Sequence, residues 1–178
     1  MGSTHQHADG NHGTLATDDA IGFDPRPLLS ALHLRGCRAV VMGQVAGILH
    51  GSQELTGDLD LLWENDPSQQ AGMGLALHDV GASITDAGGQ LVHGSPFALP
   101  KILFRSATAS GDLCTPDLPW KGLAVREFIA RADSTSALDG TPIHFISRPD
   151  LIAMRLAVGR EKDLRRAVEL EDLQQSGH

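Results

Sequence analysis

Residues 40–64 read VVMGQVAGILHGSQELTGDLDLLWE and join a strand pattern to a helix pattern and then to a second strand pattern. The run 37–42 is compact and rich in β-formers, and Gly43 interrupts it. Residues 45–50 then favour a helix that ends at Gly51. This order of strand, glycine, helix and strand indicates a mixed α/β domain rather than a helical bundle or an all-β protein.

The second strand pattern, 58–63, carries two carboxylates on one face. Its faces are Leu59, Leu61 and Trp63 against Asp58, Asp60 and Leu62. Because side chains alternate along a strand, Asp58 and Asp60 project together, with their Cα atoms ~6–7 Å apart. Two carboxylates this close repel each other unless a cation lies between them, and Mg²⁺ binds one or two carboxylates together with phosphate oxygens. Two aspartates on a solvent-facing strand without any function remain the alternative.

The turn before this strand adds a candidate phosphate contact. Gly51 allows the backbone to approach a phosphate closely, and Ser52 offers a hydroxyl and an amide to an anion. Alone, a Gly-Ser turn is a weak signal. Combined with the paired aspartates, it favours a site for a phosphorylated ligand and a divalent cation.

The rest of the chain continues the α/β pattern. Residues 147–150 are a helix start, with Ser147 as the cap and Asp150 three residues later. Residues 82–98 are rich in glycine and could hold one or two short strands, at 83–86 and 90–93. The other expected strands are 101–107, 111–114 and 141–147, and the expected helices are 27–34, 67–78, 123–132, 148–158 and 160–174.

Composition bounds the function further. The chain has 178 residues, 41% of them apolar, which suits one domain with a sizeable core. Its 14 basic and 22 acidic residues give a net charge of −8, which argues against a broad basic face for duplex nucleic acid. Only 4% of the residues are aromatic, which argues against a stacking platform for single strands. The sequence contains no P-loop, GxGxxG or GxSxG motif.

The N-terminal segment, the apolar runs and the cysteines predict the domain bounds and the cellular location. Residues 1–22 lack periodicity and are expected to be a disordered tail, followed by one domain over 23–178 whose C-terminal helices span 147–175. No apolar run approaches the ~18–20 residues of a membrane span. Cys37 and Cys114 are far apart and are expected to be core residues, which makes the cytoplasm the expected location.

Two stretches resemble a known family. Residues 40–64 resemble the nucleotidyltransferase superfamily related to DNA polymerase beta, and more narrowly the minimal nucleotidyltransferases grouped with AbiEii/MenT-type toxins. Residues 147–173, SRPDLIAMRLAVGREKDLRRAVELEDL, are similar to the C-terminal signature of that group. The resemblance implies a mixed sheet flanked by helices with a short helical C-terminal part.

The resemblance also implies roles for particular residues. Asp58 and Asp60 would hold the metal that carries the NTP phosphates, and Asp112 would complete a second metal site, with Asp117 as the alternative third acid. The implied cofactor is Mg²⁺, as two ions, or Mn²⁺. Lys162 would contact the triphosphate together with Gly51, Ser52 and Arg155. An ordinary solvated helix with charged pairs remains the alternative for Lys162.

Two departures from the family pattern concern the same site. Gly43-Gln44 stands where relatives often have Gly-Gly, and Gln53-Glu54 stands where many have a basic residue. The expected function is transfer of an NMP from an NTP to an acceptor hydroxyl. The acceptor could be a tRNA 3′ end, for a toxin with an antitoxin partner, or an antibiotic, another small molecule or a protein. A degenerate nucleotide- or partner-binding domain, or a plain acidic interaction domain, is the non-enzymatic alternative.

Overall fold

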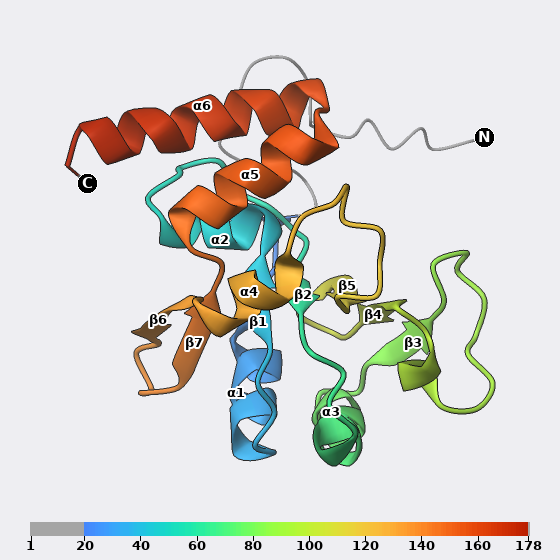
Figure 1. Ribbon diagram of the computed structural model, residues 1–178. Coiled ribbons are helices and arrows are strands. Elements are labelled where there is room, and N and C mark those ends of the chain that lie inside the picture. Colours follow the sequence, from blue (N-terminus) through green and yellow to red (C-terminus); the bar gives the residue numbers. More distant parts are fainter. Residues whose placement is uncertain (1–19, 178) are drawn as a thin grey trace, which may run out of the picture.

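A computed structural model describes residues 20–177, which form an α/β structure around one mixed sheet (Figure 1). Residues 1–19, most of the expected tail, lie outside the described residues, and residues 20–22 form a turn. Seven strands of the described part join in the order β3-β4-β5-β2-β1-β7-β6. The expected fold class, a mixed sheet flanked by helices with helices at the C-terminal end, is confirmed.

The bounds of the elements are as follows. The strands are β1 (Val40–Met42), β2 (Asp60–Leu62), β3 (Ser83–Thr85), β4 (Lys101–Arg105), β5 (Ser110–Cys114), β6 (Asp133–Ser136) and β7 (Pro142–Phe145). The helices are α1 (Arg26–Leu34), α2 (Gly43–Leu49), α3 (Pro67–Asp79), the 3₁₀ turn η2 (Pro96–Ala98), α4 (Val125–Ala130), α5 (Arg148–Val158) and α6 (Glu161–Gln175).

The register of the central strands positions the acidic residues. Strand β2 pairs antiparallel with β1 and parallel with β5, where Leu61 lies beside Leu113. An isolated parallel bridge joins Asp58 to Ser110. Paired residues of neighbouring strands point to the same face, so Asp58 and Asp60 of one strand share a face with Asp112 of the next.

Gly111 makes this close pairing possible. A Cβ added at Gly111 would lie 1.9 Å from the carbonyl oxygen of Leu59, which belongs to the backbone and cannot rotate away. Any larger residue would therefore force β5 away from β2. The absence of a side chain at this one position keeps the strand that bears Asp112 against the strand that bears Asp60.

Helices cover both faces of the sheet. Helices α1 and α3 pack together on one side, whereas α2, α5 and α6 lie on the other, and α5 and α6 form an antiparallel hairpin (Figure 1). Leu59, Leu61 and Trp63 are fully buried, and Trp63 meets Phe97 edge-on. The alternation in 58–63 therefore separates a core face from an acidic face, as the sequence predicts. In the described residues, no helix is long and apolar enough to span a membrane.

The other helices and strands expected from the sequence are mostly confirmed, with three differences. Strand β6, whose residues are all exposed, was not expected, because its sequence DSTS has no apolar alternation. The second short strand of the glycine-rich segment is only a bridge between Thr85 and Leu91. Ser147 precedes α5 as expected, but its hydroxyl donates to Asp150 at 2.8 Å instead of capping a backbone amide.

Candidate active site

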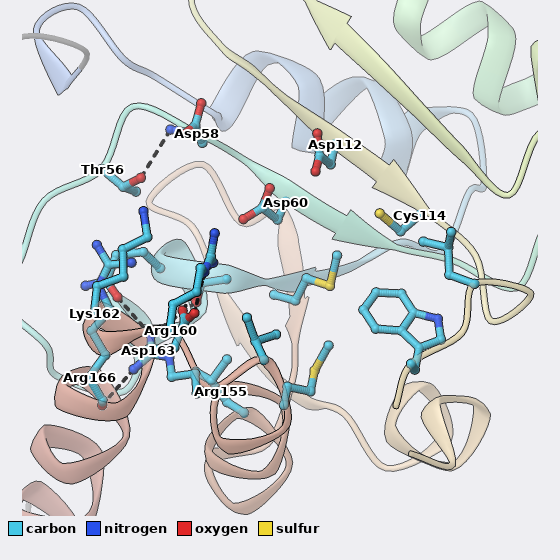
Figure 2. Close-up of a pocket in the computed structure, with 18 of the residues that line it drawn as sticks. Thr56, Asp58, Asp60, Asp112, Cys114, Arg155, Arg160, Lys162, Asp163 and Arg166 are labelled. Atoms are coloured by element: carbon cyan, nitrogen blue, oxygen red, sulfur yellow. Dashed lines mark hydrogen bonds and ion pairs between the residues drawn. The ribbon is translucent and has the colours of Figure 1, made fainter. Parts of the chain in front are cut away.

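Three carboxylates line one pocket of the structure. Asp58 and Asp60, from β2 and the segment before it, and Asp112, from β5, line a cavity of about 560 Å³ between the sheet and the C-terminal helices. Figure 2 shows the three acids along the strands on one side, and Arg155, Arg160, Lys162 and Arg166 on the other. The structure thus brings together all three predicted acids, with both Lys162 and Arg155 in the same lining.

Asp60 lies deepest among the acids. Burial, followed by the negative charges of Asp112 and Asp58, raises the pKa of Asp60 to about 7. Gly43 is the reason the carboxylate fits there, because a Cβ on Gly43 would lie 2.2 Å from Asp60 Oδ2. Gly43 also has a φ of 63°, which disfavours any other residue. The turn from strand β1 to helix α2 therefore requires glycine at position 43 to leave room for the Asp60 carboxylate.

Lys101 is an additional charge in this site that sequence reasoning did not find. It starts β4, opposite Cys114 of β5, so its side chain lies diagonal to Asp112 on the same face. Its Nζ forms an ion pair with Asp112 Oδ2. Burial would lower the pKa of Lys101, but the hydrogen bond and charge of Asp112 outweigh it, and the pKa is raised.

The carboxylates suit a hard divalent cation. Within residues 20–177, no three His, Cys, Asp or Glu side chains lie close enough together to hold a metal ion as they stand. Asp58 and Asp60 nevertheless offer oxygen ligands from one strand face, and the raised pKa of Asp60 records a repulsion that a cation would relieve. Mg²⁺ commonly uses only one or two carboxylates and takes its other ligands from water and phosphate. This donor set therefore fits the expected metal.

The opposite wall of the pocket is cationic. Lys162 is half-buried near the start of α6, on the pocket side, and Arg160 precedes it in the turn after α5. Arg160 Nε donates to Asp163 Oδ2 at 2.6 Å, which holds the guanidinium at the end of the helix. Arg166, one turn further along α6, donates to Glu54 Oε1 at 2.6 Å. Three cationic groups thus face the acidic strands across the cavity.

Arg155 lines the pocket, and its guanidinium also makes hydrogen bonds within the protein. It is buried, and its Nη1 donates to the carbonyl of Arg166 at 2.8 Å while Nη2 donates to Gln44 Oε1 at 2.8 Å. Burial, followed by the charge of Arg166, lowers the pKa of Arg155 to about 10. These contacts join α2, α5 and α6 behind the pocket. Arg155 therefore organises the pocket wall, and its role in binding a nucleotide stays a prediction.

Gln44 explains one departure from the family pattern. It is buried and fully engaged: its Nε2 donates to Ser52 Oγ at 3.0 Å and to the carbonyl of Glu54 at 2.7 Å, and its Oε1 accepts from Arg155. Glu54 in turn pairs with Arg166. The residues that depart from the pattern thus contact one another, and together they attach the loop before Asp58 to the C-terminal helices.

Gly51 and Ser52 lie away from the pocket lining. The Ser52 hydroxyl is buried and donates to Glu169 Oε2 at 2.9 Å, and Gly51 is exposed with a φ of 102° beside Leu173. Helix α2 separates these two residues from Gly43 and directs them toward α6, and their role in binding a phosphate stays a prediction. Around Gly51 and Ser52, the residues that line the pocket are Met42, Gly43 and Gln44 before them and Leu55, Thr56 and Gly57 after them.

One end of the pocket is apolar. Leu118 and Trp120 line it from the loop that follows Cys114, and Met154 lines the pocket from α5. The indole Nε1 of Trp120 donates to the carbonyl of Thr115 at 2.9 Å, which anchors the ring just after β5. Burial raises the pKa of the Cys114 thiol to about 12, so this group is uncharged near neutral pH. This end therefore offers a flat apolar surface beside an acid.

Some pocket residues that were not predicted could have been found from the sequence pattern. The expected hairpin of 101–107 and 111–114 contains Lys101, and its register would have placed the lysine beside Asp112. Gly43 was visible as the residue that interrupts a strand. Trp120 had no such signal, because it lies in an irregular loop that only the tertiary structure brings to the pocket.

Comparisons with known proteins give structural likenesses but no match by sequence. No protein-family model and no curated protein matches the sequence. Among solved structures, the fold is similar to ANT(2")-Ia in complex with adenylyl-2"-tobramycin, with a TM-score of 0.48 and 14% sequence identity. The similarity covers 85% of this chain and 92% of that one. The bound adenylyl-2"-tobramycin belongs to that complex.

Proposed function

We propose that this protein is a Mg²⁺-dependent nucleotidyltransferase of the DNA polymerase beta superfamily that moves an NMP from an NTP to an acceptor hydroxyl. The observation that carries the proposal is the convergence of Asp58, Asp60 and Asp112 on one face of the sheet, opposite the cationic wall of Lys162 and Arg160. Acids that hold a cation on one side and bases that hold phosphates on the other are what phosphoryl-type transfer requires.

In the proposed reaction, the acceptor oxygen forms a bond to the α-phosphorus and the bond from that phosphorus to the α,β-bridging oxygen breaks. Pyrophosphate leaves with the electron pair, and the proton of the hydroxyl passes to Asp112. Asp58 and Asp60 would hold Mg²⁺, which when bound neutralises charge on the phosphate oxygens. Lys162 and Arg160 would orient the leaving pyrophosphate, and orientation of this kind supplies much of the rate.

The proposed reaction assigns one side of the pocket to the pyrophosphate and the other to the acceptor. In an in-line displacement the attacking hydroxyl stands opposite the leaving group. If pyrophosphate lies at Lys162 and Arg160, the acceptor enters from the side of Asp112, where Trp120 and Leu118 form the apolar wall. This favours an acceptor that presents an apolar or aromatic ring beside its hydroxyl.

Three acceptor classes follow from the sequence, namely a tRNA 3′ end, an antibiotic or other small molecule, and a protein, and each can present such a group. A tRNA acceptor would agree with the AbiEii/MenT-type resemblance, in which case an antitoxin partner and a cytoplasmic location are also expected. One activity assay separates the tRNA and the antibiotic options. The protein is incubated with each labelled NTP and Mg²⁺, and with either total tRNA or hydroxylated antibiotics that include tobramycin.

Asp58→Asn and Asp60→Asn are the decisive variants. Each is expected to lower transfer at least a hundredfold, because each removes a cation ligand while keeping side-chain volume. Asp172→Asn is the matched control, since Asp172 is an exposed carboxylate on α6 outside the pocket. Wild-type turnover in either pocket variant refutes the proposal. Mg²⁺-dependent NTP binding without turnover on any acceptor shows the nucleotide-binding module instead.

A further inference from the structure

The third carboxylate already has a cation of its own. Lys101 Nζ is ion-paired with Asp112 Oδ2, and both side chains are about 30% exposed, at 31% and 28%. The pairing is built into the sheet, because the β4–β5 register places Leu103 opposite Asp112 and Lys101 opposite Cys114. Because side chains alternate along a strand, the register places Lys101 on the face that carries Asp112, and its ammonium group is directed to the acidic pocket.

Lys101 already places one positive charge at Asp112, on the strand face that carries the acids. A second divalent cation would bring two further positive charges against Lys101, at a distance where like charges repel strongly in a partly buried site.

Lys101 also acts on the neighbouring acid. Its charge opposes the rise in the pKa of Asp60, against the effects of burial and of Asp112 and Asp58. Lys101, Asp60 and Asp112 also share one pocket lining. Lys101 differs from Lys162, which belongs to the opposite wall.

We propose that the ammonium group of Lys101 takes the place of a second divalent cation at Asp112, so that the site binds one divalent cation, held by Asp58 and Asp60. Lys101 is then a positioning residue that holds the Asp112 carboxylate in place beside the acceptor hydroxyl. This inference rests on the proposed function, and it replaces the two-ion arrangement implied by the family resemblance with a single ion and a fixed lysine.

The test counts bound Mn²⁺, a paramagnetic ion with similar preference for oxygen ligands. Protein saturated with α,β-methylene-ATP is equilibrated with Mn²⁺, unbound ion and nucleotide are removed by ultrafiltration, and electron paramagnetic resonance measures Mn²⁺ per chain and the coupling between ions. The wild type is expected to bind one uncoupled Mn²⁺. Lys101→Met is expected to bind two, with the coupling of ions roughly 3.5–4 Å apart.

Matched variants control for charge and for folding. Lys101→Arg keeps the positive charge and is expected to bind one ion, as is Lys121→Met, because Lys121 is exposed and outside the pocket. Circular dichroism verifies that each variant folds. The wild-type count does not depend on any variant's folding.

The outcomes separate the two proposals. Two coupled ions in the wild type, or a single ion in folded Lys101→Met, overturn the role of Lys101 while the proposed function stands. Failure of the wild type to bind Mn²⁺ at all with the nucleotide analogue overturns the proposed function and this inference with it. One ion in the wild type and two in Lys101→Met support both.

Discussion

Replacing Asp60 with Asn removes the group whose ionisation is most disfavoured in the pocket. Burial and the charges of Asp112 and Asp58 raise the pKa of Asp60 from 3.8 to about 7. Asparagine has nearly the same shape and no charge to lose. The variant should therefore lose transfer activity and yet be more stable than the wild type when no metal is bound.

The magnitude follows from the two pKa values. In the unfolded chain Asp60 ionises near pH 4, whereas in the folded protein it keeps its proton to about pH 7. Between these values the folded state binds more protons, so the stability of the wild type falls as pH rises. The full shift corresponds to roughly 4 kcal/mol above pH 7, and partial exposure at the pocket reduces this to about 2 kcal/mol. Below pH 4 the difference vanishes.

Urea unfolding in EDTA, at pH 5 and at pH 8, measures this effect. Asp60→Asn should exceed the wild type by about 2 kcal/mol at pH 8 and by less than half of that at pH 5. Asp172→Asn should show no such growth with pH, because that carboxylate is exposed. A variant that is no more stable than the wild type at pH 8, or a difference that does not grow with pH, refutes the assignment of Asp60 as a strained, like-charged acid.

Three further predictions concern the surroundings of the acids. Gly43→Ala should cost about 3 kcal/mol in urea unfolding and abolish NTP binding by calorimetry, because its Cβ meets Asp60 Oδ2 at 2.2 Å and its φ is positive; unchanged stability contradicts this. Glu54→Gln should cost about 2 kcal/mol, since it leaves Arg166, whose side chain is 12% exposed, without its carboxylate; a loss below 0.5 kcal/mol shows an unimportant pair. Trp120→Ala should raise the KM for the acceptor at least fivefold with the KM for NTP unchanged, and the reverse pattern places the nucleobase on Trp120 instead.

Strand β4 and the segment 58–63 were predictable because the apolar residues of each recur with a period of two that matches their burial. The alternation in 58–63 separates the fully buried Leu59 and Leu61 from Asp58 and Asp60, and the structure keeps that separation. Strand β6 could not be predicted in the same way. Its four exposed residues contribute nothing to the core, and pairing with β7 alone makes it a strand.

Contacts between distant segments limit what the sequence can reveal about the site. The expectation for Gly51 and Ser52 depended on local geometry, whereas the position of Ser52 is decided by Glu169, 117 residues later in the chain. Likewise, the function of Gln44 becomes visible only when Arg155 and the Glu54 loop are placed around it. Propensity and spacing contain no information about such partners, because they describe neighbours along the chain.

The attachment of the loop before Asp58 to α6 has a consequence for biosynthesis. Glu54 is held by Arg166, and Ser52 by Glu169, so the first half of the acidic site is fixed by residues translated more than a hundred codons afterwards. A nascent chain on the ribosome that still lacks α6 would contain the aspartates but not the α6 contacts that fix the loop before Asp58. Under the proposed function, catalytic competence would arise only late in translation, and unfinished chains would not consume nucleotides.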